Sequence, residues 1–263
     1  MNYFEAFLFG AIQGITEYLP ISSSAHLILL PQFLGTQDPG LAFDVFLHLG
    51  TLIATLVFFK SEWIELLKTL KTHAMEKKGI SWLNLVVVTL PAVMAGGLFK
   101  NFIESHLRAN WIQAAALATG GVLLWLSDKI SSSAKSDKDV TVQSAFAVGC
   151  FQVLALIPGM SRSGSTMMGG RFLGFNKAAA AKFSFMASTP ITAAALVYEM
   201  RHWHELFAST VGVGPMLVAG VSSFVFGWLA IGALLKIVKN FGFSVFAIYR
   251  VVLALVVIKT LGY

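Results

Sequence analysis

Two long apolar stretches of this chain are each broken in the middle by proline, glycine and serine. Phe4–Leu34 is interrupted by Pro20 and Ser22–Ser24, and Phe146–Phe175 is interrupted by Pro158–Gly159 and Ser161–Gly164. Backbone that leaves a helix inside a bilayer loses its hydrogen-bond partners, so it must line a cavity or be buried in protein. We therefore predict two re-entrant hairpins of two half-helices each, with a pair of kinked spanning helices as the alternative.

The rest of the chain is dominated by apolar segments of membrane-spanning length. Hydrophobic residues make up 56% of the sequence and charged residues 12%, about half the charged share of a soluble domain. This composition argues against a disordered chain and a soluble enzyme, and the single cysteine, Cys150, excludes an internal disulfide. Because a spanning helix needs about 20 mostly apolar residues, we predict six spans, at Leu41–Phe59, Trp82–Phe99, Trp111–Ser127, Phe183–Glu199, Val211–Leu235 and Phe243–Tyr263.

The positive charges lie mostly in one set of loops. If each hairpin enters and leaves on one side, loops 60–81, 128–143, 171–182 and 236–242 share a side and carry 13 Lys and Arg, against four on the other side. Lys and Arg collect in cytoplasmic loops, so the first set is predicted to face the cytoplasm. The same bias explains the net charge of +6 without nucleic-acid binding.

The two broken stretches resemble each other in sequence. Leu19–Ser23 resembles Ile157–Ser161 at an offset of 138 residues, and the same offset places Thr51 on Thr189. We therefore predict an all-α integral membrane protein forming a single domain over 1–263, with inverted pseudo-repeats at about 1–128 and 141–263. Inverted repeats with broken helices place their site near the bilayer midplane, where the hairpins meet.

The first hairpin carries a carboxylate, several hydroxyls and an imidazole. Gln13 and Glu17 are four residues apart, on one helix face. Ser22, Ser23 and His26 follow Pro20, and a hydroxyl becomes a nucleophile when a base such as His or Glu accepts its proton. A serine-rich turn that merely caps the following half-helix is the alternative.

The second hairpin carries the features of an anion site. Gly159 and Gly164 let backbone approach an anion closely, and Arg162 is a planar fork that can pair with phosphate oxygens. Ser161, Ser163 and Thr166 add hydroxyl donors. An ion pair between Arg162 and Glu17 across the hairpins is the alternative, and the loop is not a Walker A motif because the GK[ST] ending is absent.

Other polar residues at membrane depth are secondary candidates. Asp44 and His48 are four residues apart and could support the site, bind a divalent cation or lie near an interface. Arg250, inside the last predicted span, is expected to pair or to snorkel. The pairs Gly96–Gly97 and Gly120–Gly121 are expected to permit close helix packing.

The two hairpin sequences resemble a known family. GAIQGITEYLPISSSAH and ALIPGMSRSGSTMMGG are similar to the two signature segments of the bacterial undecaprenyl pyrophosphate phosphatases, the bacitracin-resistance family, and the similarity extends over nearly the whole chain, including Phe43–Ala54 and Phe246–Arg250. In the family, a Glu or Gln is followed four positions later by a Glu. The resemblance implies that Gln13 and Glu17 occupy these two positions. Gln13 is the amide variant, so Glu17 is left as the only carboxylate of the pair. The family's other site positions fall on Ser22, Ser23, His26, Ser161, Arg162, Ser163 and Thr166.

The resemblance also implies a reaction. The family hydrolyses undecaprenyl diphosphate to undecaprenyl phosphate and inorganic phosphate, which recycles the lipid carrier of cell-wall precursors and confers bacitracin resistance. We expect Ser23 to attack the terminal phosphorus and His26 or Glu17 to accept its proton, with direct attack by water as the variant. Arg162 would bind phosphate, and a divalent cation, Mg²⁺ or Ca²⁺, would have Glu17 as its ligand.

The resemblance also implies where the protein lies, and the residues leave two alternative functions to consider. The resemblance implies a multi-pass protein of the bacterial plasma membrane with a site open to the periplasmic or outer face, and it allows a homodimer. The main alternative is a transporter or flippase of lipid phosphates, which needs the anion pocket but no nucleophile. An anion channel is disfavoured because no charged ring accompanies Arg162.

Overall fold

Helices make up almost all of the structure. The computed structural model describes residues 1–71, 78–199 and 211–262, and within them the only β-type pairing is two isolated bridges. Two short 3-10 helices, η1 (Asp137–Asp139) and η2 (Leu154–Leu156), accompany the α-helices. The predicted all-α class is confirmed. The α-helices are α1 (Tyr3–Tyr18), α2 (Ser23–Leu34), α3 (Leu41–Phe58), α4 (Lys60–Lys71), α5 (Trp82–Leu98), α6 (Lys100–His106), α7 (Asn110–Ile130), α8 (Val142–Val153), α9 (Arg162–Phe172), α10 (Lys177–Glu199), α12 (Val213–Asn240) and α13 (Ser244–Leu261).

Each of the six predicted spans is a helix, although Tyr263 lies outside the described residues. By length and composition, three helices can cross a membrane, namely α10, α12 and α13. The pair α3 and α4, bent by 75° between Phe58 and Lys60, makes a fourth candidate. The helix α5 is apolar but only 17 residues long. The described helices thus support three or four crossings by this criterion, and the number six stays a prediction.

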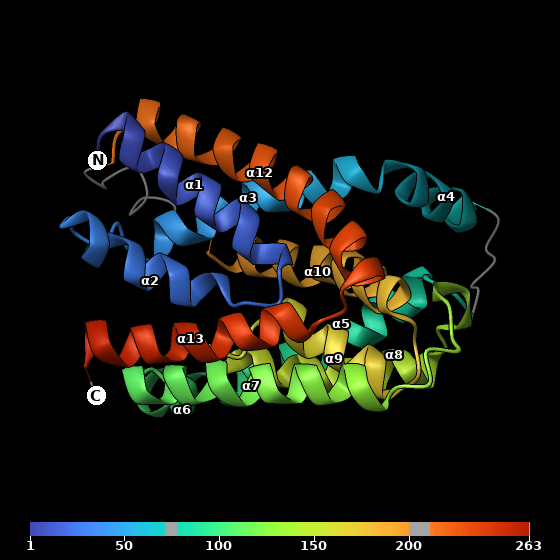
Figure 1. Ribbon diagram of the computed structural model, residues 1–263. Coiled ribbons are helices and arrows are strands. Elements are labelled where there is room, and N and C mark those ends of the chain that lie inside the picture. The colour runs from blue at the N-terminus through green and yellow to red at the C-terminus, as the bar shows by residue number, and fades with distance from the viewer. Residues whose placement is uncertain (72–77, 200–210, 263) are drawn as a thin grey trace.

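Each broken stretch forms two helices that pack on one another. The first is α1 and α2, which contact each other and are joined by a turn at Leu19–Ser22. The second is α8 and α9, joined through η2 and a turn at Ile157–Ser161. The two pairs come from opposite ends of the molecule and their turns meet near its middle (Figure 1). Neither stretch forms a kinked continuous helix.

The two halves of the chain interlock. The closest helix pairs join one half to the other, with α1 against α12, α5 against α8 and α7 against α13. Glycines allow the approach of α1, since a Cβ at Gly10 would lie 2.1 Å from the Ala219 carbonyl oxygen and one at Gly14 would lie 2.6 Å from the Gly227 nitrogen. The hairpin of the first half is thereby held by a helix of the second.

The two glycine pairs singled out in the sequence behave differently. A Cβ at Gly121 would lie 3.0 Å from the Ala247 carbonyl oxygen of α13, so Gly120–Gly121 does permit close packing. In α5, a Cβ at Gly97 would meet nothing within 4 Å, and one at Gly96 would make only an ordinary contact. The expectation of close packing was therefore wrong for Gly96–Gly97, because that face of α5 points to open space.

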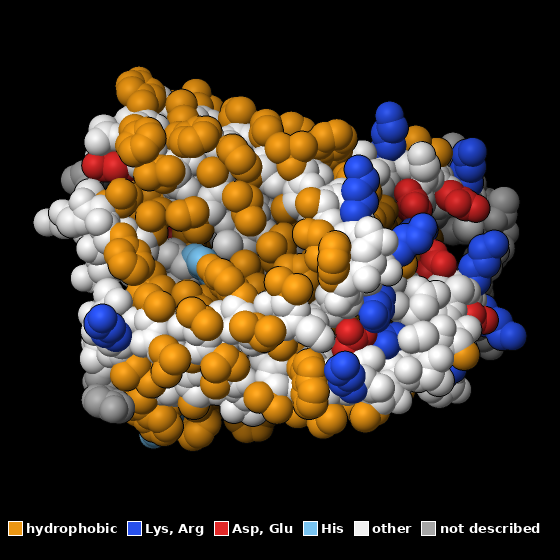
Figure 2. Space-filling model, in the orientation of Figure 1, with side chains coloured by type: hydrophobic (Ala, Val, Ile, Leu, Met, Phe, Trp, Pro, Cys, Tyr) orange, Lys and Arg blue, Asp and Glu red, His pale blue; other side chains and the backbone are white. Residues whose placement is uncertain are grey.

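The surface is apolar along most of its length and charged at one end. Figure 2 shows hydrophobic side chains over the part built by α1, α2, α7, α12 and α13, with most charged side chains at the opposite end from the termini. Ile248, Leu255 and Val221 are among the exposed large hydrophobics. At the charged end, Lys182 pairs with Glu62 at 3.1 Å and with Asp137 at 3.0 Å.

Candidate active site

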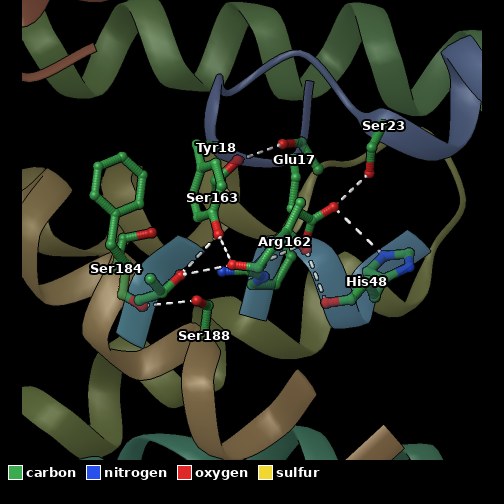
Figure 3. Close-up of polar contacts among 12 residues, drawn as sticks. Glu17, Tyr18, Ser23, His48, Arg162, Ser163, Ser184 and Ser188 are labelled. Carbon is green, nitrogen blue, oxygen red and sulfur yellow. Dashed lines mark hydrogen bonds and ion pairs between the residues drawn. The ribbon is translucent and has the colours of Figure 1, made fainter. Parts of the chain in front are cut away.

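The site is built around Glu17, a buried carboxylate in the last turn of α1. Its Oε1 accepts a hydrogen bond from Nη2 of Arg162 at 2.5 Å, and its Oε2 accepts one from the Ser23 hydroxyl at 2.8 Å (Figure 3). Oε2 also accepts a bond from Nε2 of Gln13 at 3.0 Å. The ion pair between Arg162 and Glu17, which the sequence left as an alternative, is present. Residues from both hairpins therefore share one carboxylate.

The chain path explains why Ser23 and Arg162 face each other. Each is the first residue of a helix, α2 or α9, and each follows a serine with positive φ, 70° at Ser22 and 69° at Ser161. Such φ values are costly for non-glycine residues and occur mainly at functional sites. The first turn of a helix presents unpaired N–H groups and positive dipole charge, so both turns favour an anion between them.

His48 completes the cluster from α3. Its Nε2 lies 3.4 Å from Oε2 of Glu17, and its Nδ1 donates to the backbone carbonyl of Asp44 at 2.7 Å. Support of the site was one of the three roles predicted for His48, and the structure places this residue beside Glu17. Two sequence signals pointed to His48, namely its spacing from Asp44 and its place in Phe43–Ala54, a segment that shares the family resemblance.

These side chains line a cavity of about 290 Å³. Glu17, Ser23, His48 and Arg162 form its polar wall. Its lining also includes the apolar side chains of Ala92, Ile191, Ala195 and Leu196, from α5 and α10. Nη1 of Arg162 has no hydrogen-bond partner among the described residues. The guanidinium therefore keeps one donor group for an anion while the other holds Glu17.

The remaining hydroxyls and the amide predicted for the site differ in their position. Ser22 and Ser161 line the cavity, and the Ser161 hydroxyl accepts a bond from the Gly164 amide at 3.1 Å as the cap of α9. Gln13 is fully buried behind Glu17.

Ser163 and Thr166 lie behind the cavity wall and hold the second turn. The Ser163 hydroxyl donates to the Leu19 carbonyl at 3.1 Å, which joins the two turns directly. Thr166 is buried, its hydroxyl donates to the Arg162 carbonyl at 3.0 Å, and it lies 2.6 Å from the Ser184 hydroxyl.

His26 points away from Ser23. Its Nδ1 lies 2.7 Å from the Ser22 carbonyl oxygen and its Nε2 lies 2.7 Å from the Tyr249 hydroxyl, with the two rings stacked. Of the two bases that the sequence offered for Ser23, the structure brings Glu17 into contact with the hydroxyl and does not bring His26.

The donor set does not fit a resident divalent cation at Glu17. Both carboxylate oxygens already accept bonds from Arg162, Gln13 and Ser23. Mg²⁺ and Ca²⁺ need several oxygen ligands. The described residues contain no cluster of three His, Cys, Asp or Glu side chains that could hold a metal ion.

These features define a helical membrane protein with a buried polar cluster, in which a serine hydroxyl is bonded to a carboxylate beside an arginine. The chain belongs to the family of the bacitracin resistance protein BacA, whose family model matches residues 6–256. It is 41% identical over 269 residues to an undecaprenyl-diphosphatase of Gemmatimonas aurantiaca, covering 100% of this chain and 99% of that protein. It is also 41% identical over 261 residues to an undecaprenyl-diphosphatase of Elusimicrobium minutum, covering 99% and 98%. The family and the apolar helices together identify a multi-pass membrane protein.

Proposed function

We propose that this protein hydrolyses undecaprenyl diphosphate to undecaprenyl phosphate and inorganic phosphate. The relatives named undecaprenyl-diphosphatase match it over almost their whole length. The observation that carries the proposal is the Ser23 hydroxyl donating to Glu17 at the cavity wall, with Arg162 on the other carboxylate oxygen. A transporter of lipid phosphates would need the arginine but not this hydroxyl–carboxylate pair.

The polar and apolar side chains of the cavity lining suit the two parts of the substrate. The isoprenoid tail is apolar and packs favourably against Ile191 and Leu196, while the diphosphate meets Nη1 of Arg162 and the amides at the starts of α2 and α9. Ser22 and Ser161 add hydroxyls at the same wall. Phosphoryl transfer depends mainly on positioning and on neutralising the charge of the non-bridging oxygens.

The reaction then follows from the contacts of Ser23. Its oxygen attacks the terminal phosphorus while Glu17 accepts the hydroxyl proton, and the bond from that phosphorus to the bridging oxygen breaks to release undecaprenyl phosphate. The proton held by Glu17 passes to the departing undecaprenyl phosphate, which restores the carboxylate. Water next attacks the phosphoserine and gives a proton to Glu17, which returns it to the Ser23 oxygen as inorganic phosphate leaves. In the variant mechanism, Glu17 activates water for direct attack on the terminal phosphorus.

The other predicted residues support these groups. Gln13 orients Glu17, and Ser163 and Thr166 hold the second turn. His26 is proposed to anchor the first turn through the Ser22 carbonyl. A divalent cation, Mg²⁺ or Ca²⁺, is proposed to arrive chelated by the diphosphate, because Glu17 already accepts three hydrogen bonds and the described residues contain no cluster of three His, Cys, Asp or Glu side chains that could hold a metal ion.

The topology is proposed to be six spans and two re-entrant hairpins, in an inverted repeat of 1–128 and 141–263. Support comes from the two hairpin pairs that enter from opposite ends (Figure 1) and from the matching positive φ at Ser22 and Ser161. The charged end would face the cytoplasm of a bacterium, and the cavity would open to the outer side of the plasma membrane. A homodimer is proposed from the family resemblance alone, and light scattering of the purified protein tests it.

Phosphate release from undecaprenyl diphosphate by purified protein in detergent tests the function. Wild type should release phosphate, and Ser23→Ala and Arg162→Ala should each lose most of this activity while remaining monodisperse. Activity retained in Ser23→Ala would move the mechanism to direct water attack. No release by folded wild type, with and without Mg²⁺ or Ca²⁺, would overturn the proposed function in favour of transport.

A further inference from the structure

Arg250 is a fully buried arginine in α13 whose partners are all backbone carbonyls. Nε donates to the Leu117 carbonyl at 3.0 Å, and Nη2 to the Ala116 carbonyl at 3.2 Å, both in α7. The guanidinium also donates to the Pro20 carbonyl at 3.3 Å, and to the Gly159 and Met160 carbonyls at 3.1 and 2.9 Å. One planar group therefore binds α7 and both hairpin turns.

The neighbouring sequence leaves room for this guanidinium. A Cβ at Gly120 would lie 2.1 Å from Nη2 of Arg250, and a Cβ at Gly164 would lie 2.8 Å from Nη1. Gly121 faces the Cβ of Arg250 itself, where an added Cβ would come to 3.2 Å. Helices α7 and α9 thus each carry a glycine where a side chain would displace the arginine.

A second buried arginine provides a comparison. Arg171, near the end of α9, pairs with Asp128 at 3.1 Å and holds the charged end of the second hairpin. No carboxylate contacts Arg250 among the residues that the structure describes. Burial of a charge without a counter-ion is costly, and here the charge is buried at the point where the two turns meet.

We propose that Arg250 is a positioning residue that sets the separation of the two turns, and hence of Ser23 and Arg162. The Pro20 carbonyl lies three residues before Ser23 and the Met160 carbonyl two residues before Arg162, so the guanidinium fixes the chain just ahead of each group. A single ammonium cannot reproduce this fork, because its three donors leave from one atom. The inference deepens the proposed function and rests on it for its catalytic consequence.

Steady-state kinetics test that consequence. Arg250→Lys and Gly120→Ala, which pushes on the guanidinium without removing it, should each lower kcat about 100-fold, the effect of misplacing reacting groups by about 1 Å. Their KM should change by less than about threefold, because Arg162 and the helix N-termini remain. Arg171→Lys and Gly97→Ala are the matched controls, and both should retain kcat within about twofold per monodisperse protein.

A distance measurement tests the positioning role of Arg250 without using activity. Ile28 of α2 and the single cysteine, Cys150 of α8, are both exposed, so Ile28→Cys with the native Cys150 accepts one spin label on each hairpin. Pulsed electron paramagnetic resonance should give one narrow distance in this background and in Arg171→Lys, and a shifted or broadened one in Arg250→Lys and Gly120→Ala.

The kinetic and distance measurements test the role of Arg250 separately from the proposed function. An unchanged distance in Arg250→Lys, or a kcat within about twofold of wild type, would overturn the positioning role. Absence of phosphate release by wild type would overturn the proposed function, and the distance arm would still decide whether Arg250 holds the turns.

Discussion

At the scale of single residues, the site depends on how completely Glu17 is engaged. One carboxylate receives bonds from Gln13, Ser23 and Arg162 and lies beside His48, while it is almost fully buried. Bonds to a charged acceptor are stronger than neutral ones, particularly away from water. The cluster therefore sets the serine hydroxyl at a fixed position on the cavity wall before any substrate arrives.

Replacing Glu17 by glutamine should abolish most of the activity without unfolding the protein. The amide keeps the shape but cannot take the Ser23 proton, so kcat should fall about 100-fold or more. Phosphate release per monodisperse protein measures this. Glu5→Gln, a half-buried carboxylate in the first turn of the same helix whose capping role glutamine can keep, should leave kcat unchanged, and a Glu17→Gln enzyme with wild-type kcat would exclude Glu17 as the base.

His48 should matter through its ring and not through its neighbour Asp44. His48→Leu removes the group beside Glu17, and loss of one bond to a charged group, about 1.5 kcal/mol or more, should lower kcat about tenfold. Asp44→Asn should be close to wild type, because His48 bonds the backbone carbonyl of Asp44 and not its side chain. Equal losses in the two variants would argue for a general effect on α3.

The contacts of Glu17 also predict how cations bind. Calorimetric titration of substrate-free protein with Mg²⁺ or Ca²⁺ should show no stoichiometric site, because Glu17 already accepts three hydrogen bonds and the described residues contain no cluster of three His, Cys, Asp or Glu side chains that could complete a metal site. The same titration with a soluble diphosphate present should show binding. A single site in the substrate-free protein that disappears in Glu17→Gln would contradict the proposal that the cation arrives with the diphosphate.

At the scale of elements, the position of the first hairpin is decided by helix contacts that only glycine allows. Helix α1 lies so close to α12 that Gly10 and Gly14 have backbone atoms where a Cβ would be. Since α1 ends at Tyr18, one residue beyond Glu17, its packing determines where the carboxylate sits. The contact between α1 and α12 thus connects helix packing to the geometry of the site.

Gly14→Ala should therefore destabilise the protein and reduce activity together. Overpacking of a tight contact costs about 1–3 kcal/mol, which should lower the thermal unfolding midpoint in detergent by several degrees. Gly97→Ala is the control, since an added Cβ there meets nothing within 4 Å and alanine favours the helix. A Gly14→Ala protein as stable as wild type would mean that α1 can move away from α12 freely.

At the scale of the whole molecule, charge and hydropathy are arranged along one axis. Apolar side chains cover most of the face in Figure 2, and Lys, Arg, Asp and Glu side chains gather mainly at the end away from the termini. This asymmetry orients a membrane protein, because Lys and Arg in short loops stay in the cytoplasm.

The orientation can be read with single cysteines in a Cys150→Ser background. Ser105→Cys, on α6, and Ala134→Cys, at the charged end, both replace exposed residues. A membrane-impermeant maleimide added to intact bacterial spheroplasts should label Ser105→Cys and reach Ala134→Cys only after permeabilisation. The reverse pattern would place the charged end outside and overturn the proposed orientation.

The sequence by itself determined the helical membrane class, the two broken stretches and five polar residues of the cavity lining, which are Glu17, Ser22, Ser23, Ser161 and Arg162. It did so because proline, glycine and serine in an apolar run are local signals, and because Glu17, Ser23 and Arg162 lie inside the two motifs that carry the family resemblance. The family assignment confirms that resemblance. These local signals do not determine the number of membrane spans, because that number depends on how short helices such as α5 pack among their neighbours.

Only the tertiary structure decided which of these residues meet. His48 joins Glu17 from another helix, His26 turns to Tyr249 instead of Ser23, and Arg250 binds both turns from the last helix. Each of these contacts links segments far apart in the chain, so no local pattern encodes it. The sequence marks residues that are costly to bury, whereas the packing of α3, α7 and α13 determines the partners that offset that cost.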